Sequence, residues 1–593
     1  MKSKSFILFR LMRIFIFFAC LYCCACQMST STTQETGLPI DPDDTLFVAP
    51  IARGLGDGTS WQNATDDVQW SIKEANLNGK RYVLVAGGTY IPKGEPNAIT
   101  GGDSVRRVHF SLLNNVTVMG GFSGYETKLN PRGRATIFSG NLGGGSNAYH
   151  VFYHPMGIGL DASAELQNVT IREGKADETS GTHGFGGGMY NDGNSPTLID
   201  CIFVSNTVHI RGGGMYNTNS SPRLDNCFFD NNTVVDGSGA GMYNLNNSNP
   251  YLTDCTFINN TVLDGSGGGM YNGTSEGSYV TSNPKLENCD FIGNKAFRGG
   301  GISNWLNGNN VTLTNCTFTR NIATYSSSNV QYGGGGVFNA DSSPKIDTCV
   351  FEMNEAENTN GGGMYNYLHF ALPSQPDITG SVFIENKAAL DGGGICNYKS
   401  DPRITACTFS GNTAKFGGGM CNDEDSISQL INCTFFGNSV TSRGGGIFNS
   451  PLCDLYITNC TFTDNRAVNY GGGIFYSGSG DFEIYGTIIV GNIALSYDDI
   501  DGTPSSSTDN LIGDSTNTVS AIFANVSSGK AVLRDNGGPT KTVMIRAGGL
   551  AHNQISETNM KNWYSVTDMS TVTDQRGNPR FADLLGDIGA VER

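Results

Sequence analysis

Three arginines stand at the same place in a recurring glycine-rich motif, and this spacing is the first that suggests chemistry. Arg211, Arg298 and Arg443 each come directly before a Gly-Gly-Gly run, and Asp391 takes that place in another copy. If the copies stack on one another, these side chains form a charged stripe along one edge. Such a stripe suits a sugar or a calcium ion, and a row of solvated surface charges is the other interpretation.

Nine cysteines recur two residues before a phenylalanine, so the thiol is the most regular reactive group. Residues two apart share one face of a strand, which places each Cys and Phe together in the core. Neighbouring parallel strands point their Cβ atoms the same way, so we predict buried free thiols rather than disulfides. The predicted stack contains Cys201, Cys227, Cys255, Cys289, Cys316, Cys349, Cys407, Cys433 and Cys460, with phenylalanines that begin at Phe203, Phe229 and Phe257.

Two more cysteines, Cys396 and Cys421, share a different repeated position, which Tyr or Phe fills in most other copies. We expect both side chains to face outward. No histidine accompanies them, and a four-ligand metal site needs more donors than two thiols. The sequence therefore predicts no metal site at this position.

One repeat positions all these residues. Gly-Gly-Gly-Met-Tyr-Asn begins at Gly186, and ten further versions follow, the last at Gly471. The mean period is about 28.5 residues, and each unit holds two short strand-like pieces rather than the long Gly-free run of a helical repeat. Superposed identical positions indicate an all-β parallel β-helix, regular over residues 186–497.

The sixth residue of the motif is Asn in ten of the eleven copies. It shares the parity of the Met, Ile or Val at the fourth position, so it faces the core. A buried amide repeated in every coil predicts a ladder in which each side chain bonds those above and below. The predicted ladder is Asn191, Asn217, Asn244, Asn272, Asn304, Asn339, Asn366, Asn397, Asn422 and Asn449.

The segments on either side differ from the repeat. Residues 45–185 are predicted to hold an N-terminal cap and the first coils, with a short amphipathic helix around Ile72 over the open end of the core. Residues 498–593 are predicted to hold the last coils and a separate C-terminal end. Leu198 and its equivalents, three residues before the Cys, have the wrong parity for one straight strand, so a bend is expected without a definite position.

The N-terminus has the layout of a bacterial lipoprotein signal. Basic residues between Lys2 and Arg13 precede a short apolar stretch that ends at Ala25. We predict that Cys26 becomes acylated, with Cys24 as the alternative; a plain signal peptide with incidental cysteines is the other interpretation. The signal then spans residues 1–25, and a flexible tether spans 26–44.

Composition excludes several classes of protein. Of 593 residues 80 are Gly, which is near twice the average usage of about 7%, and 10% are aromatic. A disordered chain has fewer aromatic residues, and collagen needs Gly at every third position. The net charge of −17 argues against nucleic acid as a partner, because phosphate binding needs a basic surface.

Three strings near the C-terminus complete the pattern: DNGGPT at 535–540, TDQRGNPR at 573–580 and DIGAVE at 587–592. With the repeat, they resemble secreted right-handed parallel β-helix proteins of bacteria, especially the Bacteroidetes. The middle is similar to the repeats of chlamydial polymorphic outer-membrane proteins, and the three strings resemble the domain called choice-of-anchor Q. The resemblance implies a right-handed single-stranded β-helix at the outer membrane or cell surface of a Gram-negative bacterium. No sorting tail follows Glu592, so the N-terminal lipid would be the only anchor.

Members of this fold include both binding rods and enzymes, so the fold does not decide the function. Related lyases and hydrolases are similar in using clustered acids with an Arg or Lys base, or a Gly-His-Gly segment, and this chain has scattered histidines and no Gly-His-Gly. We therefore expect a non-catalytic adhesin that binds glycans or host surface molecules without a cofactor. A polysaccharide lyase or glycoside hydrolase acting on acidic or neutral glycans is the alternative.

Two further features bear on a binding site. Asp498, Asp499 and Asp501 suggest a calcium loop, although the EF-hand spacing is absent. Rigid scaffolds carry function on loops. The long inserts at 273–283, 324–332 and 367–376 are therefore the expected functional loops.

Overall fold

The computed structural model describes residues 38–93, 102–131, 133–275, 280–305, 310–325, 332–370, 373–513, 518–564, 572–580 and 587–591. The predicted signal peptide and its candidate acylation residues, Cys24 and Cys26, lie outside these ranges. The chain divides into two compact units, of which the smaller comprises residues 1–40 and 126–130. In its described part, Pro39 and Lys128 form an antiparallel bridge.

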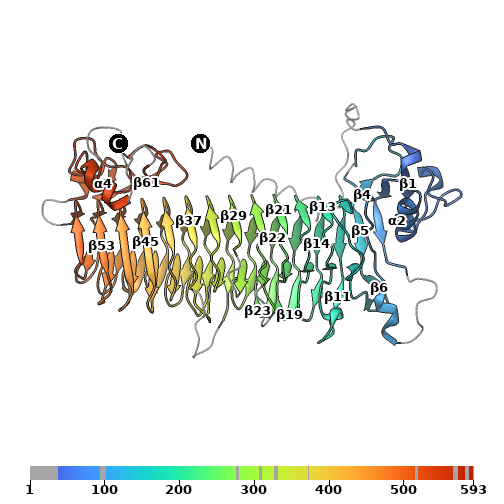
Figure 1. Cartoon of the computed structure of the whole chain (residues 1–593), viewed down its shortest axis with the longest axis horizontal. Coiled ribbons are helices and arrows are strands. Elements are labelled where there is room, and N and C mark those ends of the chain that lie inside the picture. The colour runs from blue at the N-terminus through green and yellow to red at the C-terminus, as the bar shows by residue number, and fades with distance from the viewer. Residues whose placement is uncertain are drawn as a thin grey trace. The chain divides into compact units, whose positions relative to one another are not determined.

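The larger unit is a parallel β-helix (Figure 1). A regular coil contributes one strand to each of four long sheets, which we number 1 to 4 in chain order and which have 16, 15, 11 and 13 strands. Strands pair in register with their equivalents in the neighbouring coils, so that Phe203 faces Phe229. The predicted fold class is confirmed. One coil consists of β13 (Thr197–Ile199), β14 (Ile202–Val204), β15 (Thr207–Val208) and β16 (Met215–Thr218).

The bend that the parity of Leu198 requires lies one residue before the Cys. Asp200 has a φ of 53°, and its equivalents Asn226 and Asp254 have φ values of 49° and 52°. Asn and Asp adopt this left-handed conformation more readily than other non-glycine residues. The turn lets Leu198 in sheet 1 and Cys201 at the start of sheet 2 both point into the core, where each is fully buried.

The core consists of side chains stacked along the coils. Rings of successive phenylalanines are nearly coplanar, with centroids 4.7 Å apart for Phe203 and Phe229 and 4.6 Å apart for Phe229 and Phe257. The glycines of the motif leave room for this stack. A Cβ on Gly214 would lie 2.5 Å from the carbonyl oxygen of Gly241 and 2.8 Å from the Phe229 ring, so a larger residue does not fit.

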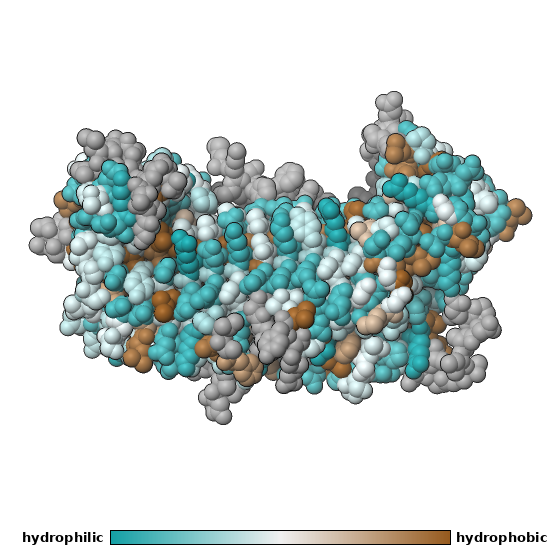
Figure 2. Space-filling view, viewed as in Figure 1, coloured by the Kyte–Doolittle hydropathy of each residue, from teal (hydrophilic) through white to brown (hydrophobic). Residues whose placement is uncertain are grey.

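The predicted helix is present at the N-terminal end as α2 (Val68–Leu77). The Asp67 carboxylate accepts a hydrogen bond from the Trp70 N–H and caps the helix. Val68, Ile72 and Ala75 are buried in the same hydrophobic cluster as the coil interior, so α2 closes this end of the core. Figure 2 shows a mostly hydrophilic surface along the coils and more apolar residues at this end.

The C-terminal segment leaves the β-helix and folds back along it. The last coil ends with β56 (Ser506–Thr508) and β57 (Leu511–Ile512), and α4 (Glu557–Tyr564) lies beside earlier coils (Figure 1). The three C-terminal strings meet here: Gln575 Nε2 donates to Thr540 Oγ1 and to the Cys407 carbonyl oxygen. Arg580, fully buried, donates to the Asp587 carbonyl oxygen and to Asn432 Oδ1. These strings therefore attach the segment to the rod.

Candidate functional site

The ten asparagines of the motif lie in one continuous hydrogen-bonded row inside the β-helix. Each side-chain amide donates to the Oδ1 of the next, at 2.8 to 2.9 Å, and all ten residues are fully buried. The last, Asn449, donates to the Cys453 carbonyl oxygen. Every amide of the row has a hydrogen-bond partner. The row therefore avoids buried, unpaired polar groups, which would destabilise the folded state.

His154 precedes this row and was not predicted from the sequence. It is the register partner of Asn191, and its Nδ1 lies 2.7 Å from Asn191 Oδ1. The Leu112 N–H donates to the other ring nitrogen, Nε2, so the proton of the neutral ring is on Nδ1 and is donated to Asn191. Burial lowers the pKa of His154 to about 4, which keeps this arrangement neutral near pH 7.

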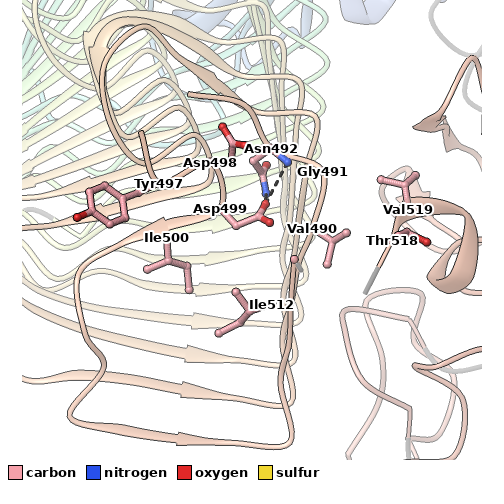
Figure 3. Close-up of a pocket in the computed structure, with 11 residues that line it drawn as sticks. Val490, Gly491, Asn492, Tyr497, Asp498, Asp499, Ile500, Ile512, Thr518 and Val519 are labelled. Carbon is pink, nitrogen blue, oxygen red and sulfur yellow. Dashed lines mark hydrogen bonds between the residues drawn. The ribbon is translucent and has the colours of Figure 1, made fainter. Parts of the chain in front are cut away.

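A second row follows the Asn three residues after each Phe. It runs from Asn206 to Asn492, and the Asn492 amide donates to the Asp499 carboxylate at 2.8 Å (Figure 3). Asp499 lines an open cavity of about 560 Å³, and burial raises its pKa to about 6. Asp498 accepts a hydrogen bond from the Ala494 N–H. These acids therefore complete backbone and side-chain hydrogen bonds at the end of the coils.

The nine stacked cysteines are buried free thiols. The Cys255 thiol donates to the Thr253 carbonyl oxygen at 3.3 Å, and Cys289 makes the equivalent bond to Glu287. Burial raises the pKa of both thiols. Protonated, hydrogen-bonded thiols are poor nucleophiles, so Cys255 and Cys289 have a packing role.

The outward face of sheet 4 carries aromatic side chains, whereas its inward face carries the asparagines. Tyr153, Tyr190, Tyr216, Tyr243 and Tyr271 lie in one row, with neighbouring ring centroids 4.7 to 5.6 Å apart. The row continues through Ser303 and Phe338 to Tyr365, Cys396, Cys421, Phe448 and Phe475.

Cys396 and Cys421 correct one expectation. Both lie on the outward side of the sheet, as their position implied, yet they are only 2% and 1% exposed. They belong to a cluster with Tyr365 and Phe338, and half-buried rings including Tyr398 and Phe448 pack against it. Neighbouring aromatic residues therefore remove an outward position from solvent.

The three arginines of the stripe lie over aromatic rings rather than in open solvent. The Arg211 guanidinium is 5.2 Å from the Phe185 ring centroid, and that of Arg443 is 5.1 Å from Phe475. Asp391, which shares their position, is largely buried; burial is the main cause that raises its pKa, to about 7. The stripe thus contains three ring-bound cations and, between Arg298 and Arg443, one weakly ionised acid.

The rings are densest around Arg298. Its guanidinium carbon lies 4.1 Å from the centroid of Tyr332, 5.0 Å from Trp305 and 5.2 Å from Tyr325. Tyr325 and Tyr332 lie at the two ends of the insert at 324–332, whose residues 326–331 lie outside the described ranges. We call Arg298, Trp305, Tyr325, Tyr332, Tyr367 and His369 the aromatic platform.

Elements of several coils position this platform. Trp305 ends β28 (Ile302–Trp305), and Tyr367 ends β36 (Met364–Tyr367). Asp341, after β32 (Val337–Ala340), accepts a hydrogen bond from the backbone N–H of His369 at 2.7 Å. This bond holds the start of the third insert against the rod, and the His369 ring lies 5.0 Å from the Trp305 ring. Trp305, Tyr325, Tyr367 and His369 are half-buried, so their rings are partly accessible.

A group of ionisable side chains lies at the N-terminal end of the outward face of sheet 4. Tyr149 is packed between the Arg106 guanidinium at 4.1 Å and the His183 ring at 4.4 Å, and its hydroxyl donates to Glu178. Arg106 also pairs with Asp177. Tyr149 is 1% exposed, so this network closes the end of the face and leaves its hydroxyl out of reach of a substrate.

Comparison with known proteins identifies the fold family. The family model described as "Right handed beta helix region" matches residues 138–321 and 319–494. The chain belongs to this right-handed β-helix family. No curated protein sequence matches it significantly.

Several solved structures are similar to this chain at low sequence identity. The mannuronan C-5 epimerase AlgE4 A-module of Azotobacter vinelandii is 12% identical over 75% of this chain and 95% of its own, with a TM-score of 0.32. The tailspike gp49 of Acinetobacter baumannii bacteriophage Fri1, a capsular polysaccharide depolymerase, is 13% identical over 70% and 59%, with a TM-score of 0.28. The surface adhesin PfbA of Streptococcus pneumoniae is 12% identical over 62% and 87%, with a TM-score of 0.27. None of these similarities identifies a ligand or a reaction for this chain.

The described ranges contain no group of three or more His, Cys, Asp or Glu side chains arranged to hold a metal ion. They also contain no helix with the length and apolar character needed to cross a bilayer.

Proposed function

We propose that this β-helix is a surface-exposed, non-catalytic rod that binds glycans through the aromatic platform. The platform itself is the observation that carries the proposal, because half-buried rings from separate coils surround one guanidinium beside the inserts. Binding sites for small molecules combine apolar and aromatic walls with a few polar groups that fix orientation. Sugar rings offer both partners, with C–H groups for the aromatic faces and hydroxyls for Arg298 and the tyrosine hydroxyls.

A binding assay with matched variants tests this proposal. Immobilised glycans of varied composition are exposed to the full chain and to Trp305→Ala, which removes one wall of the platform. Loss of one stacking contact worth about 1.4 kcal/mol lowers affinity about tenfold. Tyr251→Ala is the control, because Tyr251 is also a half-buried ring with a cation, Lys285, 5.2 Å away, but lies in sheet 1. Equal affinity of both variants for every bound glycan would contradict the proposal.

The alternative activity is separable in the same experiment. A polysaccharide lyase or glycoside hydrolase releases new chain ends, so each bound glycan is incubated with the protein with and without calcium. Reproducible turnover that Arg298→Ala abolishes would replace the binding role by catalysis. Binding without turnover supports the non-catalytic rod.

Export and anchoring form the second part of the proposal. We place a signal peptide at 1–25, a lipid on Cys26, a tether over 26–44 and a choice-of-anchor Q-like end within 498–593. The repeats would then be related to those of polymorphic outer-membrane proteins, on the surface of a Bacteroidetes-type bacterium. Cys26→Ser should abolish fatty-acid labelling and release the protein. Persistence of the label would move the attachment site to Cys24.

A further inference from the structure

The geometry points to a polysaccharide bearing oxyanions, carboxylate or sulfate, as the ligand class, with Arg298 as the residue that binds the anionic group. This inference rests on the proposed function, since it concerns the same aromatic platform. Three rings surround the Arg298 guanidinium, and its Nε is buried without a hydrogen-bond partner.

Among the described residues, the arginines of the stripe form no ion pair with an acid, whereas some other cations of the molecule do. Lys285 pairs with Glu287 at 2.7 Å, and Arg106 pairs with Asp177 at 2.7 Å. Within the described ranges, no carboxylate forms such a pair with Arg298, Arg211 or Arg443. Arg223 also forms no such pair with a described residue, so the feature that distinguishes Arg298 is the contact of its guanidinium with three aromatic rings.

Ring contacts hold a guanidinium without using up its donors. A cation over an aromatic face is attracted by the ring, while the N–H groups at the guanidinium edge remain directed outward. Such an edge forms two parallel hydrogen bonds with a carboxylate or another oxyanion. The neighbouring rings of Trp305 and Tyr332 also exclude water, which strengthens the charge interaction. The platform therefore combines a surface for a sugar ring with a fork for its anionic group.

The stripe also gives the ligand a direction. Arg211 and Arg298 are three coils apart, and Arg298 and Arg443 are five coils apart, which corresponds to about 14 Å and about 24 Å at the spacing of parallel strands. A linear polyanion lying along the rod reaches two of these arginines at once, and a short oligosaccharide reaches one. Linked contacts raise the effective affinity of the longer chain. Asp391, between Arg298 and Arg443, and Asp501, near Arg443, oppose the anion locally.

Two pairs of polymers with the same backbone test the inference. Polygalacturonate is compared with fully methyl-esterified pectin, and dextran sulfate is compared with dextran. We expect the charged member of at least one pair to bind at least tenfold more tightly, with affinity falling as ionic strength rises. Arg298→Gln should remove this preference, and Arg298→Lys should retain part of it, since Lys keeps the charge without the fork. Arg223→Gln is the matched control, because Arg223 lies 5.7 Å from the Tyr251 ring in sheet 1.

The possible results separate this inference from the proposed function. Preference for polygalacturonate identifies carboxylate as the bound group, and preference for dextran sulfate alone identifies sulfate. Equal binding of charged and uncharged polymers, still sensitive to Trp305→Ala, would overturn the inference and leave the glycan-binding proposal intact. Equal loss in Arg298→Gln and Arg223→Gln would also overturn it. Absence of binding to any glycan would instead remove the proposed function.

Discussion

The two faces of sheet 4 follow different rules although the same strands build both. On the inward face, Asn recurs in ten coils because each amide must donate to an identical neighbour. On the outward face, Tyr271 is followed by Ser303 and then Phe338. The comparison shows that strict repetition specifies the fold. Local departures from it, such as Ser303, Trp305 and the inserts, mark where the rod differs along its length.

The largest expected effect is a charge placed on the inward side. Cys255→Arg should prevent folding of its coil, because removing the partner of a buried charge already costs about 3–5 kcal/mol and this site offers no partner at all. Cys255→Ala should cost only about 1 kcal/mol, since it removes one sulfur atom. Denaturant unfolding followed by circular dichroism measures both. Equal stability of the two variants would mean that the thiol stack is open to water.

Acid should weaken the N-terminal coils. The pKa of His154 is lowered to about 4 in the folded chain, against 6.5 for an ordinary His, so the unfolded chain takes up the proton first. This contribution is fully present above about pH 6.5 and falls as pH drops toward 4, by at most about 3 kcal/mol. Burial lowers the pKa of His150 to about 3 and adds an effect of the same sign. Melting temperatures between pH 7 and pH 4 should fall less in His154→Asn, and an unchanged slope would contradict the assignment.

Breaking the asparagine row inside the rod should have an intermediate effect. Asn272→Ala leaves Asn244 without an acceptor and Asn304 without a donor, which should cost about 1–3 kcal/mol. Asn191→Ala should cost as much, because His154 gives Asn191 a partner on both sides. Chemical unfolding of both variants provides the comparison. A much smaller loss at Asn191 would show that the His154 bond contributes little.

The smallest effect on stability is expected on the outward face. Arg298→Gln should cost about 0.5–1 kcal/mol, the range for a cation over a ring at an accessible site. The same variant is expected to lose glycan binding, so stability and binding should separate here and nowhere on the inward face. A loss of several kcal/mol in a thermal melt would place Arg298 among the core residues and weaken the contrast between the faces.

The sequence predicts the inward face well because that face repeats. Asn272 and Cys255 stand at fixed sequence separations from the glycines of the repeat, so their positions in the coil can be derived from residue spacing alone. The corner before each Cys was not placed, because Asp200, Thr348 and Ala406 all adopt it and no single residue type marks it. The aromatic platform was missed for a related reason: Trp305, Tyr332 and Tyr367 come from different coils, and the inserts that bring them together have no repeat.

The hydrogen bonds of the interior amides all run in the same direction along the rod. Each rung accepts from the rung on its N-terminal side and donates to the rung on its C-terminal side. An Asp at an internal position could accept a hydrogen bond but would have no proton to donate near neutral pH. Each internal position therefore requires an amide. Residues other than Asn occur at the ends of the rows, where a side chain needs only to donate or only to accept a hydrogen bond. His154 only has to donate at the start of the first row, and Asp499 only has to accept at the end of the second. The direction of proton donation therefore explains why two such similar residues as Asn and Asp are not exchangeable along this rod.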